Sequence, residues 1–248
     1  MANWSDTFSG PAGSPPDPAS WTSVINGAGG GNQELEYYTA ESTALSGSGL
    51  VITGARNSGQ FSAWYGPSQF TSGKLWTLGK VNFRYGHIQV TAALPSAGKP
   101  GSWPAIWMLG SDYEDVGWPQ CGEIDIMENF GADGTAQITS SIHTTSSNLT
   151  GTYVFPAGQS ATGPHTYAID WRPGSIDFSV DGNVFFTVTS AQVPAWPFTE
   201  PFFLFLNLAI GGAAGGPVPA TAPLPYTMDV QSVKTFDGEV QQMVTTSP

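Results

Sequence analysis

The feature that most constrains the fold of this 248-residue chain is a series of short strand-like segments separated by turn residues. The segments are rich in Val, Ile, Phe, Tyr and Thr, and they recur about every 8 to 15 residues between Gly, Pro, Asn and Asp. No amphipathic helical pattern longer than about two turns is present. The pattern predicts an all-β fold, an antiparallel β-sandwich or jelly roll, with strands at Gly49–Thr53, Val81–Tyr85, His87–Ala92, Thr166–Trp171, Ser175–Val180, Val184–Val188, Phe202–Asn207 and Met228–Lys234.

The chain is expected to form a single domain over residues 1–248, because all-β sandwiches reach this length as one unit. The Pro- and Gly-rich stretches 11–18 and 211–225 are interpreted as surface loops rather than linkers. Asp181-Gly182-Asn183, between two of the predicted strands, is a strong hairpin signal. No internal repeat stands out.

Composition narrows the classes of partner. Charged residues make up 10% of the chain, against about 25% in ordinary globular proteins, and the formal net charge is −12. This balance argues against nucleic acid and anionic membranes and suits a neutral ligand. The 9 Trp, 8 Tyr and 14 Phe fit flat surfaces that stack on sugar rings, besides the filling of a sandwich core.

Further classes are excluded by what the sequence lacks. No run of 18 apolar residues predicts a transmembrane helix, and no Cys/His spacing matches a zinc site. The single Cys121 is expected to be a small buried residue. Residues Met1–Trp4 lack the basic and apolar regions of a signal peptide, so we expect either an intracellular protein or a chain whose leader has been removed.

Three carboxylates crowd into the six residues Glu123-Ile-Asp-Ile-Met-Glu128 of a chain with only 19 acids. The apolar residues between them predict a buried or half-buried strand, where acids are costly unless they have a task. Glu123 and Asp125 share a face because side chains alternate along a strand. Glu128 would face the other way in a regular strand, but one extra residue in a β-bulge at about Ile126–Met127 would return it to the same face.

The bulge would make the acids behave as if spaced i, i+2 and i+4. The outer Cα atoms would then lie roughly 13 Å apart. Glu side chains that lean inward could bring the carboxyl groups to the ~5–5.5 Å separation typical of a retaining glycosidase. The alternative is that these acids only mark a strand end near a turn.

Tryptophans surround the acids. Trp103 and Trp107 are four residues apart, so on a strand they share a face and could border the same cleft as the acids. Trp118 lies in a Gly/Pro-rich turn that leads into the acidic strand, which is a natural rim position. For Trp103 and Trp107 the alternative is packing in the core.

With these motifs in order, the chain resembles glycoside hydrolase family sixteen, of the laminarinase type (endo-β-1,3-glucanases). The resemblance covers nearly the whole chain. It is carried by residues 31–39, 71–75, 83–86, 103–109, 122–128, 165–171, 180–182, 206–212 and 229–233.

The resemblance implies a concanavalin-like β-jelly roll with a concave substrate cleft. It implies that Glu123 is the nucleophile and Glu128 the general acid/base, with Asp125 between them and hydrogen-bonded to the nucleophile. The five-residue spacing of the two glutamates is the spacing of laminarinases and agarases, whereas lichenases of the family lack the extra residue. The expected reaction is double displacement with retention at the anomeric carbon.

Other residues are carried over with alternatives. Asn32 matches an Asn that reaches the non-reducing-side subsites, Arg56 could donate to sugar hydroxyls or be a plain surface residue, and His143 matches a His near the acid/base or is structural. Asn207 lines the cleft or is a satisfied buried amide. The chemistry needs no cofactor, but the family often carries a structural calcium, and Asp229 matches its ligand position.

The expected activity is endo-hydrolysis of a neutral β-1,3-glucan. The alternatives are a non-catalytic β-glucan-binding lectin, and a transglycosylase or agarase-like galactanase of the same fold. We expect a secreted monomer, since a polymeric substrate cannot enter a cell.

Overall fold

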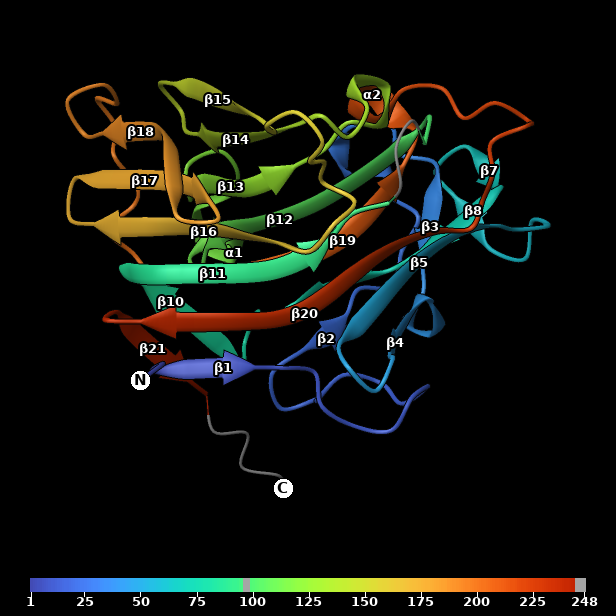
Figure 1. The fold of residues 1–248 in the computed structure, drawn as a ribbon, viewed down its shortest axis with the longest axis horizontal. Coiled ribbons are helices and arrows are strands. Elements are labelled where there is room, and N and C mark those ends of the chain that lie inside the picture. The colour runs from blue at the N-terminus through green and yellow to red at the C-terminus, as the bar shows by residue number, and fades with distance from the viewer. Residues whose placement is uncertain (96–98, 244–248) are drawn as a thin grey trace.

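The computed structural model describes residues 1–95 and 99–243, and it confirms the predicted all-β architecture (Figure 1). Two large twisted sheets face each other. The first, which we call the outer sheet, has the order β18(Asn183–Thr189)–β17(Ser175–Val180)–β16(His165–Arg172)–β11(Gly86–Ala93)–β20(Tyr226–Phe236)–β5(Leu50–Arg56)–β8(Phe70–Ser72)–β3(Glu36–Tyr38), with β1(Trp4–Asp6) on β20 and β4(Thr43–Leu45) on β5.

The second sheet carries the acidic motif, and we call it the site sheet. Its order is β15(Asn148–Val154)–β14(Gln137–His143)–β13(Glu123–Glu128)–β12(Ser102–Gly110)–β19(Phe202–Ile210)–β10(Val81–Arg84)–β21(Glu239–Gln242), with β9(Lys74–Trp76) on β19 and β2(Thr22–Ser23) on β9. A small hairpin pairs β6(Ser62–Ala63) with β7(Gly66–Pro67). All helices of the described residues are single turns: η1(Gly29–Gly31), η2(Ala40–Ser42), α1(Tyr113–Val116), η3(Gly131–Asp133) and α2(Gly212–Gly215).

Most strand pairs are antiparallel, as the sequence predicts, and the predicted strands all lie within or next to observed ones. The hairpin at Asp181-Gly182 is confirmed: both residues have positive φ, at 50° and 77°, and join β17 to β18. The pairing of β3 with β8 is parallel. The two stretches 11–18 and 211–225 are loops apart from the single turn α2.

The main core lies between the two sheets. It is one cluster of buried side chains that runs along the chain from Trp4 to Val233, which is consistent with the single-domain prediction. In Figure 1 the outer-sheet strands β16, β11 and β20 lie in front of β12, β19 and β10 of the site sheet. β20 alternates as a half-buried strand should, with Met228 and Val230 facing the core and Thr227 and Asp229 exposed.

The site sheet is covered on both faces at its centre. All nine residues of β19 are buried. Its even-numbered side chains enter the main core, whereas Phe203 and Phe205 pack on the opposite face with Leu109, Cys121 and the half-buried Trp107. Cys121 is buried and free, as predicted. We call this second cluster, with Trp76 and Leu78 packed against it, the aromatic floor. It lies on the same face of the site sheet as the acidic residues.

No helix in the described part of the chain is long and apolar enough to span a membrane.

Candidate active site

The predicted bulge is present in β13. Ile106 pairs with Met127 and Trp107 pairs with Asp125, so Ile126 has no partner in β12. On the other side, Asp125 pairs with Ser141 and Glu128 with Thr139, so two residues of β13 face one of β14. The hydroxyl of Ser140 donates to the carbonyl oxygen of Ile126, at 2.7 Å. This satisfies a carbonyl group that the interrupted ladder leaves free.

The bulge brings the three acids to one face. Glu123, Asp125 and Glu128 are opposite His143, Ser141 and Thr139, which are alternate residues of β14 and therefore share a face. Ile124, Ile126 and Met127 all enter the main core. Because the bulge turns two successive residues inward, the strand keeps its core contacts while all three carboxylates point outward.

Each glutamate accepts a hydrogen bond from an indole N–H. Trp103 Nε1 donates to Glu128 Oε1 at 2.9 Å, and Trp118 Nε1 donates to Glu123 Oε2 at 2.6 Å. Trp103 is half-buried, whereas 55% of Trp118 is exposed, as expected for a rim position. Trp103 therefore borders the acids through a direct contact, as predicted. That Trp103 and Trp118 bind substrate stays a prediction.

Burial gives the two glutamates different surroundings. Burial and the negative charge of Glu123 raise the pKa of Glu128 to about 7, although the hydrogen bond from Trp103 lowers it. A carboxyl group with this pKa is largely protonated in mildly acidic solution and can donate a proton. Glu123 is partly exposed and bonded to the exposed Trp118.

Asp125 lies between the glutamates and is only 3% exposed. Burial, followed by the charges of Glu123 and Glu128 and a hydrogen bond shared with Glu123, raises its pKa well above the ordinary value. Burial and the two flanking charges therefore favour the neutral form of Asp125, whose hydroxyl would donate a hydrogen bond to Glu123.

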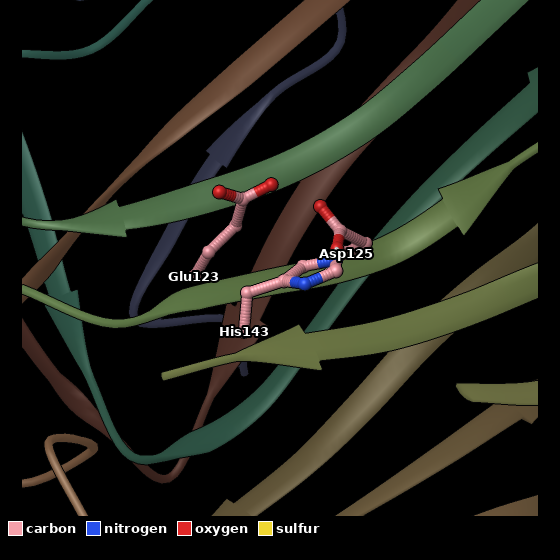
Figure 2. A group of neighbouring side chains, drawn as sticks. All are labelled: Glu123, Asp125 and His143. Atoms are coloured by element: carbon pink, nitrogen blue, oxygen red, sulfur yellow. Dashed lines mark ion pairs between the residues drawn. The ribbon is translucent and has the colours of Figure 1, made fainter. Parts of the chain in front are cut away.

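His143 completes the group (Figure 2). Figure 2 shows Glu123 and Asp125 from β13 and His143 from β14 on the same side of the sheet. His143 Nε2 is 3.2 Å from Asp125 Oδ2, but the two are not aligned as a hydrogen bond, and its Nδ1 is 3.0 Å from Asn148 Oδ1. The structure thus brings His143 to Asp125 rather than directly to Glu128.

Trp107 and Asn207 belong to the floor beside the acids. Trp107 stacks on Phe205, with ring centroids 3.9 Å apart and planes at 7°. Its Nε1 donates to Asn207 Oδ1 at 2.7 Å, and Asn207 Nδ2 donates to Tyr38 Oη at 3.3 Å. Both ends of the Asn207 amide are therefore occupied by protein, which favours the satisfied buried amide among the two sequence interpretations.

Sequence analysis missed a buried polar cluster next to this floor. Tyr38 Oη donates to Glu34 Oε2 at 3.2 Å, and the Ile210 N–H donates to Glu36 Oε2 at 2.6 Å. Burial and the charge of Glu34 raise the pKa of Glu36 well above its usual value. The signal was available, because Glu34 and Glu36 share the i, i+2 spacing that singled out Glu123 and Asp125.

Lys74 links this cluster to the acids. Its Nζ lies 4.7 Å from the Trp107 ring centroid and 5.0 Å from that of Phe205. Burial lowers the pKa of Lys74, and the charges of Glu34, Glu36 and Glu123 oppose that shift. A cation thus lies under the aromatic floor, between the two groups of carboxylates.

Two predicted sugar contacts lie away from the acids. Asn32 is exposed in the turn after η1, where its amide contacts Gly30 O at 3.4 Å. The guanidinium of Arg56 donates to the carbonyl oxygens of Pro219 and Ala220, at 2.9 and 2.8 Å, and lies 5.5 Å from the Phe70 ring centroid. These contacts make Arg56 an anchor for the 211–225 loop, which favours its structural alternative.

The described side chains add no second carboxylate ligand beside Asp229, so the calcium site there stays a prediction. Asp229 is exposed on β20 opposite Val51 and Ala93, which have no ligand oxygen in their side chains. The nearest acid on the adjoining strand β1, Asp6, uses both carboxylate oxygens for Phe8 N and Trp21 Nε1. Calcium takes six to eight oxygen ligands in proteins, backbone carbonyls among them, so further ligands at Asp229 would be main-chain oxygens.

Among residues 1–95 and 99–243, the one group of three close His, Cys, Asp or Glu side chains is Glu123, Asp125 and His143, whose ligand atoms lie within 4.8 Å. This group contains the candidate nucleophile, so an ion held there would block its attack. We therefore interpret these residues as a proton and charge network.

Known proteins resemble this chain over most of its length. The family model for glycosyl hydrolases family 16 matches residues 32–229. A β-glucanase of Rhodothermus marinus is 38% identical over 229 residues, which cover 86% of this chain and 76% of the relative. Glucan endo-1,3-beta-glucosidase A1 of Niallia circulans is 35% identical over 89% of this chain, which spans only 33% of that relative.

Solved structures give the same result for the fold. The laminarinase catalytic domain of Thermotoga maritima superimposes with a TM-score of 0.87 at 33% identity, and the match covers 98% of both chains. The jelly-roll prediction is therefore confirmed. The chain belongs to glycosyl hydrolase family 16.

Proposed function

We propose that this chain is a retaining endo-β-1,3-glucanase that cleaves laminarin-type glucan by double displacement. The observation that carries the proposal is the pair of glutamates on one face of β13, each bonded to an indole, with the pKa of Glu128 raised to about 7. The laminarinases and β-glucanases among the similar proteins support the substrate class.

In the first step, Glu128 donates its proton to the glycosidic oxygen while the Glu123 carboxylate attacks the anomeric carbon. The bond to the leaving sugar breaks, and a covalent glycosyl-enzyme forms at Glu123. In the second step, Glu128, now a carboxylate, takes a proton from water, and that water displaces Glu123 from the anomeric carbon. Two inversions give net retention.

The neighbours support these roles. A hydrogen bond from Asp125 to Glu123 would hold the Glu123 carboxylate in place for attack. Trp118 holds the other side of the same carboxylate. The aromatic floor around Trp107 and Phe205 offers apolar surface to a neutral sugar, in keeping with a net charge of −12 that disfavours anionic polymers.

The test is the release of reducing ends from laminarin, mixed-linkage glucan, cellulose, xyloglucan and agarose, with Glu123→Gln as the control. We expect cleavage of laminarin that is lost in the control, and the β-anomer as the first product by NMR. Laminarin bound but not cleaved would favour the lectin. Activity on agarose alone would favour the galactanase, and a preference for sugar acceptors over water the transglycosylase.

The location and the assembly of the protein are also proposals. A polymeric β-glucan is too large to enter a cell, so we propose that the enzyme acts outside it, as a monomer. Size-exclusion chromatography with light scattering checks the second point, and a dimer would contradict it.

A further inference from the structure

A second exposed tryptophan lies apart from the acids. Trp64 is 51% exposed and sits at the tip of the hairpin formed by β6 and β7. Within residues 1–95 and 99–243, Trp118 beside Glu123 is the other tryptophan with such exposure. A single exposed ring is common on protein surfaces, so a role for Trp64 depends on how the ring is held and on what lies between it and the acids.

The ring is held rigidly. Its Nε1 donates to the carbonyl oxygen of Glu34 at 2.8 Å. One edge packs against Tyr65, with centroids 5.4 Å apart and planes at 78°, and the Tyr65 hydroxyl donates to Leu35 O at 2.7 Å. Gly29 packs so closely that a Cβ there would come within 2.7 Å of the indole. The ring therefore has little freedom to lose when a ligand binds.

Its exposed surface is apolar. The single hydrogen-bond donor of the indole is already satisfied by Glu34 O, so what remains in water is ring carbon. A fixed and exposed aromatic ring of this kind stacks on the C–H face of a pyranose. A polar ligand that needed a donor from Trp64 would find none.

A continuous path of contacts joins Trp64 to the catalytic strand. Ala105 on β12 pairs with Glu128, and Ser102 lies three residues before Ala105 on the same strand. Three residues of a strand span about 10 Å. Ser102 pairs with Ile210, and Ile210 O accepts from Leu35 N at 2.8 Å, next to the Glu34 carbonyl that holds Trp64. Two steps between strands add about 4.8 Å each. The path from Ala105 to the strand segment beside Trp64 is thus about 20 Å long when followed along these contacts.

The exposed Asn32 lies on the same path. Its carbonyl oxygen accepts from Ala213 N at 2.7 Å, and α2, which contains Ala213, also lies beside Trp103. The Trp103 indole in turn contacts Glu128. The line from Glu128 through Trp103 and Asn32 to Trp64 therefore offers alternating aromatic and polar groups, which suits a chain of sugars.

We propose that Trp64 is a distal stacking platform for a glucosyl residue of a long β-glucan, several units from the bond that is cleaved. The proposal rests on the proposed function of the same site. It predicts that Trp64 sets the preference for long chains and has no part in the chemistry.

The test compares Trp64→Ala, Trp64→Phe and wild type on β-1,3-gluco-oligosaccharides of increasing length. Val184→Ala, an exposed apolar side chain on β18, is the control. We expect Trp64→Ala to leave kcat/KM on the shortest cleaved oligosaccharides unchanged and to lower it about tenfold on long ones, where stacking contributes. Trp64→Phe, which keeps a ring, should retain most of the long-chain rate.

A second readout does not depend on catalysis. In the Glu123→Gln background, Trp64→Ala should weaken retention in laminarin affinity gels, whereas Val184→Ala should not. An equal loss of kcat/KM at every chain length would mean that Trp64 acts by supporting Glu34, and no loss of rate or retention would also overturn the proposal. A wild type that cleaves no β-1,3-glucan would instead refute the proposed function, and the wild-type arm reports this by itself.

Discussion

At the scale of single residues, two identical side chains are given opposite roles by their neighbours. Glu128 is nearly buried and bonded to the half-buried Trp103, whereas Glu123 reaches the exposed Trp118 and the buried Asp125. Burial raises the pKa of Glu128 and so favours its neutral acid. The roles that we propose for the two glutamates thus rest on their environments and not on residue type.

The pH dependence should report this difference. Glu128 must be protonated in the first step, so activity is retained below its pKa of about 7 and is lost as the pH rises through that value. The Trp103 indole lowers this pKa by stabilising the carboxylate. We therefore expect Trp103→Phe to move the basic limb of kcat/KM to higher pH and Trp76→Phe, an aromatic change elsewhere on the floor, to leave it in place. A limb that stays or moves down in Trp103→Phe would contradict the role of the indole.

Asn207 should matter for stability. The change Asn207→Leu removes the acceptor of Trp107 Nε1, whereas Tyr38 Oη keeps its bond to Glu34 Oε2. One unsatisfied buried donor costs about 1–3 kcal/mol, so we expect the free energy of unfolding to fall by about 1–3 kcal/mol in urea titrations. Asn183→Leu, at an exposed site, should change it little. An unchanged stability with a raised KM would instead support the sugar-binding interpretation of Asn207.

At the scale of elements, the bulge in β13 determines which side chains face the core and which face the acidic site. It turns Ile126 and Met127 into the core and frees Glu128 to join the other acids. A regular strand of the same sequence would place one of these groups on the wrong face.

Met127→Ala separates the two tasks of the bulge. Met127 is fully buried, so its truncation should lower the free energy of unfolding by about 2–5 kcal/mol. The backbone pairing that orients Glu128 does not involve the Met127 side chain, so kcat on laminarin should persist at temperatures below unfolding. Denaturant unfolding and initial rates check both, with the exposed Val154→Ala as the matched surface control. A large loss of kcat in the folded variant would mean that side-chain packing, not the bulge, positions Glu128.

Local sequence patterns predict strands and tight turns because the alternation of side chains and the turn residues involve neighbouring positions only. The eight strand segments named from sequence, the acidic strand, the Asp181-Gly182 hairpin and the bulge could be placed in this way, whereas β14 and β15 were not named. The parallel pair β3–β8 could not, because parallel register depends on distant segments.

Long-range contacts also account for what was missed in the site. Lys74 reaches Trp107 from a separate strand, and Arg56 turns to the carbonyls of the 211–225 loop instead of a sugar. Glu34 and Glu36 are a different case, since their spacing matched the catalytic strand. The acidic motif could be interpreted from sequence because all its members lie within one strand, whereas the rest of the site comes from several other strands and from turns.

At the scale of the whole molecule, one sandwich presents two chemically distinct surfaces. The outer sheet exposes alternating polar side chains, as on β20, whereas the site sheet carries an aromatic floor with buried carboxylates around it. The molecule as a whole has a formal net charge of −12. A neutral glucan approaches such a surface without repulsion, and an anionic polymer does not.

Ionic strength should therefore distinguish a neutral glucan from an anionic polymer. The Debye length falls from about 30 Å at 0.01 M salt to about 8 Å at 0.15 M, so only interactions between charges weaken over this range. We expect kcat/KM on neutral laminarin to change less than about twofold, because its contacts are stacking and hydrogen bonds. Any activity on a sulfated galactan should rise as salt screens its repulsion from the net charge of −12. Initial rates on both polymers across the salt series make the comparison. A laminarin rate that falls steeply with salt would mean that charged groups dominate substrate binding, which the aromatic floor and the exposed ring carbons of Trp64 give no reason to expect.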